Sequence, residues 1–228
     1  MVQAESERTD AVELIHSIFE RGGEACITCS FQANGVVLLD MLRKVKPDIP
    51  VLFIDTGYHF PETYAYRDRM VKAWNLNLIN VTPELTVADQ EAKYGKLYND
   101  APDYCCEMRK VEPLARALEA YDIWFTGLRR GDSPTRATIP QVNKHTQPSG
   151  KTLLKVNPLV YWTTKEVQAY MAVNEIEHLP LYDQGYTSIG CQPCTKLPVD
   201  PSNPRSGRWA GQKLECGIHT FGRDGGGI

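Results

Sequence analysis

Basic residues are not in excess in this chain, and this argues against several classes of partner. The 228 residues include 25 Lys and Arg against 28 Asp and Glu, which gives a formal net charge of -3. Proteins that bind nucleic acids or anionic membranes usually carry a strong basic excess. We therefore expect neither as a partner, and an anionic ligand would have to be held by a local basic site.

Long apolar runs are missing as well. No stretch approaches the roughly 20 consecutive apolar residues that cross a bilayer, and residues 1–10 (MVQAESERTD) lack the apolar core of a signal peptide. These absences predict a cytoplasmic protein. The chain also has no internal repeat and no low-complexity tract. Its length fits one domain, or one domain with an extended tail.

Cysteine, by contrast, is abundant. Seven cysteines are many for a protein of a reducing compartment, and an odd number does not suit a set of structural disulfides. Metal binding or redox chemistry explains this number better, so the cysteines are the first place to look for function.

Strand and helix patterns alternate along most of the chain. Apolar strand patterns at 25–31, 50–54, 76–81, 123–126 and 153–160 are separated by helical patterns at 36–45, 61–74 and 105–120. Helical patterns also cover 11–20 and the segment from Thr163, where Thr163-x-x-Glu166 has the form of a capping box. The alternation predicts an α/β fold, with an open, mainly parallel, doubly wound sheet and helices on both faces.

The last part of the chain has a different composition. From residue 185 onward the sequence is rich in Gly, Pro, Ser and Asn and shows no periodic apolar pattern. Such a composition is typical of loops. We therefore divide the chain into an α/β domain at 1–184 and a flexible C-terminal arm at 185–228 with a disordered tip.

Two polar turns follow the first two predicted strands. The turn SFQANG at 30–35 joins a strand to a helix, which aims backbone N–H groups at one point and suits a phosphate, although many ordinary turns look the same. The next strand ends in Asp55-Thr56-Gly57. Ligands of doubly wound sheets bind at the carboxyl ends of adjacent strands, where both turns would lie.

Four cysteines form two pairs, Cys105-Cys106 and Cys191-x-x-Cys194. Four thiolates suit either an iron-sulfur cluster or a tetrahedral zinc ion, but adjacent cysteines are unusual in a zinc knuckle. A rival zinc pairing would use Cys26-x-x-Cys29. In an extended strand these positions face opposite sides about 10 Å apart, so we interpret them as small core residues.

The seventh cysteine, Cys216, lies in the segment ECGIH at 215–219. By spacing alone, a single cysteine on such a tail would be an incidental surface thiol. Arginines precede it in RSGRW at 205–209. A thiolate that attacks an anionic group needs nearby cations, which lower the thiol pKa and screen the approaching charge.

Taken together and in this order, the motifs resemble those of the adenylyl sulfate and phosphoadenylyl sulfate reductase family, over roughly 26–219. The resemblance implies a sheet of the adenine nucleotide alpha hydrolase type, with the nucleophilic thiol on the arm at Cys216. It also implies a 4Fe-4S cluster on Cys105, Cys106, Cys191 and Cys194. The implied substrate-binding residues are Ser30, Phe31, Gln32, Gly35, Asp55, Thr56, Gly57, Lys110, Arg129, Arg205 and Arg208. Arg130 and Arg136 are weaker candidates, and His59 and His219 have no assigned role.

The reaction implied by the resemblance is the reduction of adenylyl sulfate to sulfite and AMP by thioredoxin, through an S-sulfonate on Cys216. The cluster would act structurally and electrostatically near Lys110. By analogy with the family, a homo-oligomer is expected. Phosphoadenylyl sulfate is the alternative substrate, alone or beside adenylyl sulfate, but the members that use only that compound lack the CC and CxxC cysteines.

Two readings outside the family stay open. A tRNA-modifying enzyme of the ATP pyrophosphatase type would usually carry a SGGxDS loop, which this chain lacks. A non-catalytic zinc or iron-sulfur module would use the same four cysteines without Cys216.

Overall fold

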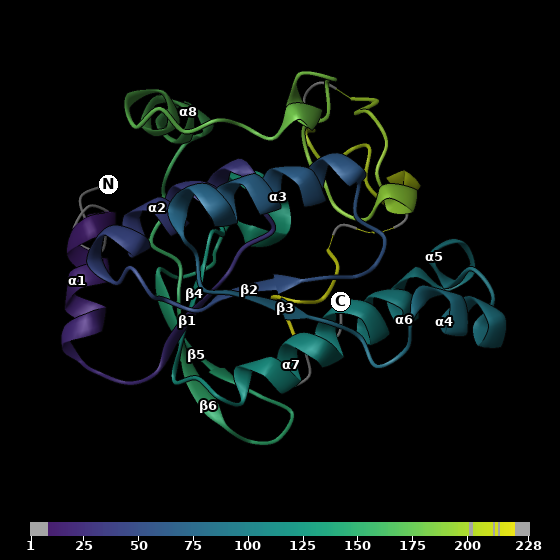
Figure 1. Cartoon of the computed structure of the whole chain (residues 1–228), viewed down its shortest axis with the longest axis horizontal. Coiled ribbons are helices and arrows are strands. Elements are labelled where there is room, and N and C mark those ends of the chain that lie inside the picture. Colours follow the sequence, from purple (N-terminus) through teal and green to yellow (C-terminus); the bar gives the residue numbers. More distant parts are fainter. Residues whose placement is uncertain (1–8, 201–202, 212, 214, 222–228) are drawn as a thin grey trace.

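The computed structural model describes residues 9–200, 203–211, 213 and 215–221. Its centre is a six-stranded sheet with the order β3-β2-β1-β4-β6-β5, in which only the edge strand β5 runs antiparallel to its neighbour (Figure 1). The strands are β1 Ala25–Thr28, β2 Val51–Ile54, β3 Leu78–Val81, β4 Ile123–Thr126, β5 Val142–Thr146 and β6 Thr152–Val156. The predicted open, mainly parallel sheet is therefore confirmed.

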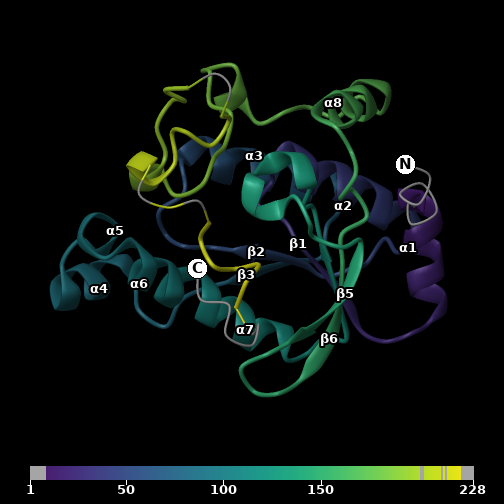
Figure 2. The ribbon, with the colours of Figure 1, turned by 180° about the vertical axis from the view of Figure 1, so that it is seen from behind.

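Helices cover both faces of this sheet (Figures 1 and 2). One apolar core lies between the sheet and the helices α1 Ala11–Glu20, α2 Ala33–Val45, α3 Pro61–Trp74 and α8 Thr164–Val173. A second core lies on the opposite face, where Leu114 and Leu118 of α7 Glu112–Leu118 pack on Trp124. The capping box predicted at α8 is present, because Thr163 and Glu166 each accept a hydrogen bond from the other's backbone N–H.

Cys26 and Cys29 are both buried, one in each of these two cores. They belong to opposite faces of the sheet, as the alternation of a strand requires. The prediction that they are small core residues is confirmed.

The structure departs from the predicted elements in two regions. β5 was not predicted; its sequence, VNKHT, is mostly polar and only His145 is buried, because an antiparallel edge strand can leave one face in contact with water. The helix predicted over 105–120 is divided into α6 Pro102–Cys106, a π-helical turn Glu107–Val111, and α7. Two helices that the apolar pattern did not indicate, α4 Val87–Tyr94 and α5 Leu97–Asp100, precede it.

The strand order reverses at β1, which pairs with β2 on one side and β4 on the other. The loops that leave β1 and β4 therefore diverge, and a crevice forms between them. At Gly127, directly after β4, an added Cβ would lie 3.1 Å from the backbone of Asn34 and Gly35. The absence of a side chain there lets the chain after β4 pass close to the first turn of α2.

The segment after α8 crosses the carboxyl edge of the sheet with short 3-10 turns at Pro180–Tyr182, Gln192–Cys194 and Trp209–Gly211 (Figure 2). It is tied to the loop after β2 by a bridge between His59 and Cys191 and by a 2.6 Å hydrogen bond from the Gln192 N–H to the Tyr58 carbonyl. The domain boundary between 184 and 185 stays a prediction. The tip predicted to be disordered, 223–228, lies outside the described residues. None of the helices in the described part of the chain is long and apolar enough to span a membrane.

Candidate active site

A cavity of about 800 Å³ lies at the carboxyl edge of the sheet, between the loops after β1, β2 and β4 and the C-terminal arm. Its volume is that of a pocket for a small molecule. The cavity lining includes these predicted site residues: Ser30, Gln32, Gly35, Thr56, Lys110, Arg129, Arg205, Arg208 and Cys216. The structure thus brings together residues from three loops, the π-helical turn and the arm.

Three of the predicted binding residues do not line this cavity. Phe31 is fully buried, and its ring packs against Phe53 with centroids 5.8 Å apart. Asp55 accepts a 2.6 Å hydrogen bond from the Tyr64 hydroxyl and a 3.0 Å bond from the Gly57 N–H. Gly57 has a φ of +72°, and an added Cβ there would lie 2.7 Å from Val87. In the described structure these residues shape the loops.

The turn after β1 presents the N-terminus of α2 to the cavity. Gln32, the N-cap, makes no capping hydrogen bond with its side chain. Its side-chain amide instead donates to Ser30 at 3.0 Å and its Oε1 accepts from the Ile189 N–H at 3.0 Å, which connects the turn to the arm. The positive end of the 13-residue helix therefore faces the cavity and is suited to an anion.

A π-helical turn directs two adjacent cations inward. Within Glu107–Val111, both Arg109 and Lys110 are buried. The Arg109 guanidinium donates to the Thr56 carbonyl at 2.5 Å and to the Gln90 side chain at 2.9 Å, and it holds the loop after β2. Lys110 lines the cavity. π-turns inside helices occur often at functional sites, and here the wider turn carries the cation that the cavity needs.

Lys110 and Cys216 stabilise each other's charged forms. Burial favours a neutral amine, but the thiols of Cys191, Cys216 and Cys106 outweigh it and raise the pKa of Lys110. Burial likewise opposes ionisation of Cys216, yet Lys110, the Ile218 N–H and Arg208 together lower the pKa of this thiol. Cys216 is half-buried and lines the cavity. A thiol in such surroundings has the character of a nucleophile.

Trp209 organises the basic residues that precede Cys216. The guanidinium carbon of Arg208 lies 4.3 Å from the centroid of its ring, and that of Arg205 lies 5.7 Å away. Arg208 also packs on Gly190, where an added Cβ would lie 2.2 Å from Nη2. A residue with a side chain at 190 would displace this arginine from the cavity.

Four thiols lie beside the cavity and do not line it. Cys105 and Cys106 end α6, and Cys191 and Cys194 flank the turn of the arm; three are buried and Cys194 is half-buried. Burial, with added repulsion from the neighbouring thiols of the group, raises the pKa of Cys105 and of Cys194 to about 11. The Cys191 Sγ lies 3.3 Å from the Thr56 hydroxyl.

All seven cysteines are free thiols. Within the described residues, no three His, Cys, Asp or Glu side chains converge in a way that would hold one metal ion. The four thiols of the two pairs nevertheless act on one another electrostatically, which places them in one neighbourhood. They form an all-sulfur donor set without a carboxylate or an imidazole.

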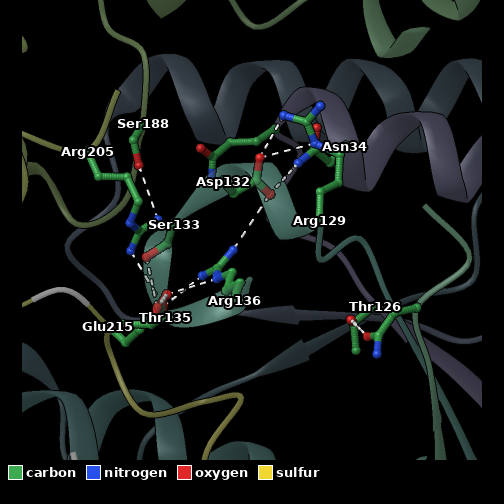
Figure 3. A network of polar contacts seen from close by, with 12 residues as sticks. Asn34, Thr126, Arg129, Asp132, Ser133, Thr135, Arg136, Ser188, Arg205 and Glu215 are labelled. Atoms are coloured by element: carbon green, nitrogen blue, oxygen red, sulfur yellow. Dashed lines mark hydrogen bonds and ion pairs between the residues drawn. The ribbon is translucent and has the colours of Figure 1, made fainter. Parts of the chain in front are cut away.

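The polar network around Glu215 was not predicted (Figure 3). Arg136 donates to both carboxylate oxygens of Glu215, at 2.8 and 2.7 Å, and Asp132 lies 3.7 Å from the same guanidinium. Arg129, predicted to bind the substrate, lines the cavity but is paired with Asp132 at 2.6 Å. The only signal in the sequence was opposite charge in the segments GDSPTR and ECGIH, with Arg136 and Glu215 79 residues apart.

The two histidines that had no assigned role have different surroundings. Burial lowers the pKa of His59 to about 4, and its Nε2 lies 2.9 Å from the Ile54 carbonyl. His219 stacks on Trp124 with ring centroids 5.7 Å apart, and burial lowers its pKa as well. Both residues line the cavity.

A doubly wound sheet with a cationic cavity at its switch point, and an ionisable thiol on that cavity, defines an α/β enzyme for an anionic ligand of nucleotide size. Residues 24–197 match the family described as the phosphoadenosine phosphosulfate reductase domain. The chain therefore belongs to the phosphoadenosine phosphosulfate reductase family.

Individual relatives agree with this assignment. The chain is similar to the adenosine 5'-phosphosulfate reductase of Mycobacterium tuberculosis, with 47% identity over 88% of this chain and 79% of the relative. The enzyme of that name from Mycolicibacterium smegmatis is 44% identical over 95% of this chain and 91% of its own. Among solved structures, the phosphoadenylyl-sulfate reductase of Candida auris in a phosphate complex superposes with a TM-score of 0.72, at 28% identity, over 82% of this chain and 91% of that one.

Proposed function

We propose that this protein reduces adenylyl sulfate to sulfite and AMP. The observation that carries the proposal is the thiol of Cys216, whose pKa is lowered by Lys110 and Arg208 beside a cavity of nucleotide size. The names of the bacterial relatives at 44 and 47% identity support adenylyl sulfate as the substrate.

The substrate would lie across the carboxyl edge of the sheet. Its phosphate suits the N-terminus of α2 at Ser30 and Gly35, where backbone N–H groups and the helix dipole favour an anion. Its adenosine would lie near Phe53 and Thr56. The sulfonate would then face the cations of the cavity, Lys110, Arg205 and Arg208. Phe31, Asp55 and Gly57 contribute to this site by shaping its loops.

The chemistry divides into two exchanges at sulfur. The Cys216 thiolate attacks the sulfur of the sulfonate, the bond from that sulfur to the phosphate oxygen breaks, and AMP leaves. This step forms an S-sulfonate on Cys216. A dithiol protein of the thioredoxin type then attacks the Cys216 sulfur, and sulfite leaves with the bonding electron pair. The second thiol of that partner restores the Cys216 thiol, and the two electrons of the reduction come from the dithiol as it becomes a disulfide.

The donor set of Cys105, Cys106, Cys191 and Cys194 fits a 4Fe-4S cluster, which takes four cysteine thiolates. The thiols of Cys106 and Cys191 act electrostatically on Lys110. A bound cluster would therefore place its charge next to the cation that supports Cys216. We infer that this effect, together with joining α6 to the arm, is its role here.

The metal content tests this part directly. Anaerobically purified protein should contain iron and acid-labile sulfide in equal amounts, about four of each per chain, and Cys106→Ser should lose both. Zinc in place of iron would support a zinc module. A Cys106→Ser protein that lost its iron but kept full activity would remove the electrostatic role.

Sulfite release with reduced thioredoxin tests the reaction. We expect turnover of adenylyl sulfate in the parent protein, none in Cys216→Ser, and near-parent activity in Cys26→Ala, a control that removes a buried thiol that does not line the cavity. Equal turnover of phosphoadenylyl sulfate would make the enzyme dual-specific. No sulfite from either compound would contradict the proposed reaction. A cytoplasmic location and a homo-oligomer stay predictions. Size-exclusion chromatography can test the oligomeric state.

A further inference from the structure

We propose that Glu215 is a positioning residue that latches the Cys216 segment onto the loop after β4 and so presents the thiol to the cavity. The proposal rests on the proposed function, because it concerns the step in which Cys216 attacks. It assigns a role to the pair Glu215 and Arg136, neither of which the reaction described above requires.

The Glu215 carboxylate is held from several directions (Figure 3). Only 6% of the residue is exposed. Both of its oxygens accept from Arg136, Oε1 also accepts from the Thr135 hydroxyl at 2.9 Å, and Arg205 lies 3.6 Å from Oε2. A two-pronged arginine contact fixes direction as well as distance. The carboxylate is therefore a fixed point of an arm whose described part has little regular structure.

The latch is in turn anchored on the cavity loops. Arg136 lies 3.7 Å from Asp132, and Asp132 accepts from Arg129 at 2.6 Å and from the Asn34 side chain at 2.9 Å. Asn34 belongs to the turn that suits the substrate phosphate. One continuous set of contacts therefore connects that turn with the residue next to the nucleophile. Because adjacent Cα atoms are about 3.8 Å apart, fixing Glu215 confines Cys216 to a small region.

The role of Glu215 is geometric and not electrostatic. Its negative charge opposes ionisation of Cys216, so a carboxylate here would slow attack unless it also supplied position. It also pairs with Arg136 and Arg205 and so offsets part of the attraction of these two arginines for the anionic substrate. Loss of Glu215 should therefore lower kcat while KM stays the same or falls. Loss of a substrate-binding residue would raise KM.

The test combines steady-state kinetics with alkylation of Cys216. For Glu215→Ala we expect kcat of sulfite release from adenylyl sulfate to fall about 10²-fold, as for a misplaced reacting group, with KM unchanged or lower. The rate of Cys216 alkylation by iodoacetamide, followed by peptide mass analysis, should rise at least about tenfold because the half-buried thiol is released. Rates are compared at the plateau reached at high pH, where differences in thiol pKa no longer contribute.

Two further variants keep the test informative if Glu215→Ala folds poorly. Thr135→Val removes one hydrogen bond from the latch, at a residue that does not line the 800 Å³ cavity. It should lower kcat a few-fold and raise the plateau rate of Cys216 alkylation a few-fold. Glu119→Ala, which removes an exposed carboxylate bonded to Ser149, is the matched control and should change neither.

Kinetics and alkylation also separate this inference from the proposed function. An inactive parent protein would overturn the reaction, while alkylation would still report whether Glu215 holds the segment. If the parent protein is active, either of two results for Glu215→Ala would contradict the latch. One is that Glu215→Ala keeps kcat or loses activity only through a higher KM; the other is that the alkylation plateau stays at the parent value.

Discussion

The two halves of the active site are held together by different forces. The loops after β1 and β2 leave the ends of strands whose residues are almost fully buried between two apolar cores. The arm contributes mainly polar and cationic contacts, among them Glu215 with Arg136 and Arg208 with Trp209. The described arm adds fewer apolar contacts than the strands: Ile189 is buried in the first core, Tyr186 packs against it, and Ile218 and Phe221 pack at the edge of the second core.

This difference suits the two tasks of the proposed reaction. A substrate cavity must keep its shape, and burial of apolar residues on both faces of a sheet provides that rigidity. A thiol that must meet first the substrate and then a partner dithiol has to leave the cavity without unfolding the domain. Segments held by a few polar contacts open locally at low free-energy cost. We therefore expect stability to reside in the sheet and activity to depend strongly on the arm.

The strongest test of this comparison is a cavity in the sheet core. Leu38 of α2 is fully buried in the first core. Leu38→Ala should lower the free energy of unfolding by about 2–5 kcal/mol, because it removes transfer energy and leaves a void. Urea unfolding followed by far-UV circular dichroism would measure this loss. A shift below 1 kcal/mol would mean that the core does not carry the stability of the fold.

The corresponding change in the arm is Trp209→Ala. It removes the ring that contacts Arg208 and Arg205, and each such cation–π contact contributes about 0.5–2 kcal/mol. We expect kcat/KM for adenylyl sulfate to fall about 10- to 100-fold, with a smaller loss of stability than in Leu38→Ala. If Trp209→Ala instead unfolded the whole domain as easily as the core variant, the arm would be part of the same cooperative unit.

A third test concerns Asp40, which connects α2 to α8. Its carboxylate pairs with Arg43 and Lys44, each at 2.6 Å, and accepts from Tyr170 at 2.8 Å. Burial raises the pKa of Asp40, but these partners outweigh it and leave the pKa below its ordinary value of 3.8. The stabilisation is therefore complete above about pH 4 and is lost as the pH falls through the lowered pKa.

Asp40→Asn should accordingly cost about 1.5–3 kcal/mol of unfolding free energy at pH 7, the range for hydrogen bonds to a charged group. The difference from the parent protein should shrink as the pH falls below 4. Unfolding midpoints measured from pH 7 to pH 3 would show this. A difference that did not depend on pH would mean that charge on Asp40 is not the source of the stabilisation. Activity at pH 7 should stay near that of the parent, because Asp40 does not line the cavity.

Much of the fold could be predicted because its signals are local. The bounds of α1 and α3, the capping box at Thr163 and the alternation of strands with helices all depend on residues close together in the chain. The π-helical turn and β5 could not be predicted in this way. A π-turn has no distinct apolar period, and a polar edge strand is defined only by the neighbour with which it pairs.

The sequence by itself determined the class of fold, the family and a set of site residues, most of which line the cavity, because strand periodicity and ordered motifs are properties of neighbouring residues. Only the tertiary structure decided which of those residues face the cavity, with Phe31 and Asp55 turned into the loops and Lys110 directed inward. It also decided that Glu215 meets Arg136 across 79 residues of chain. Such pairs depend on how strands are ordered in the sheet and on how the arm folds back, and no local pattern encodes that geometry.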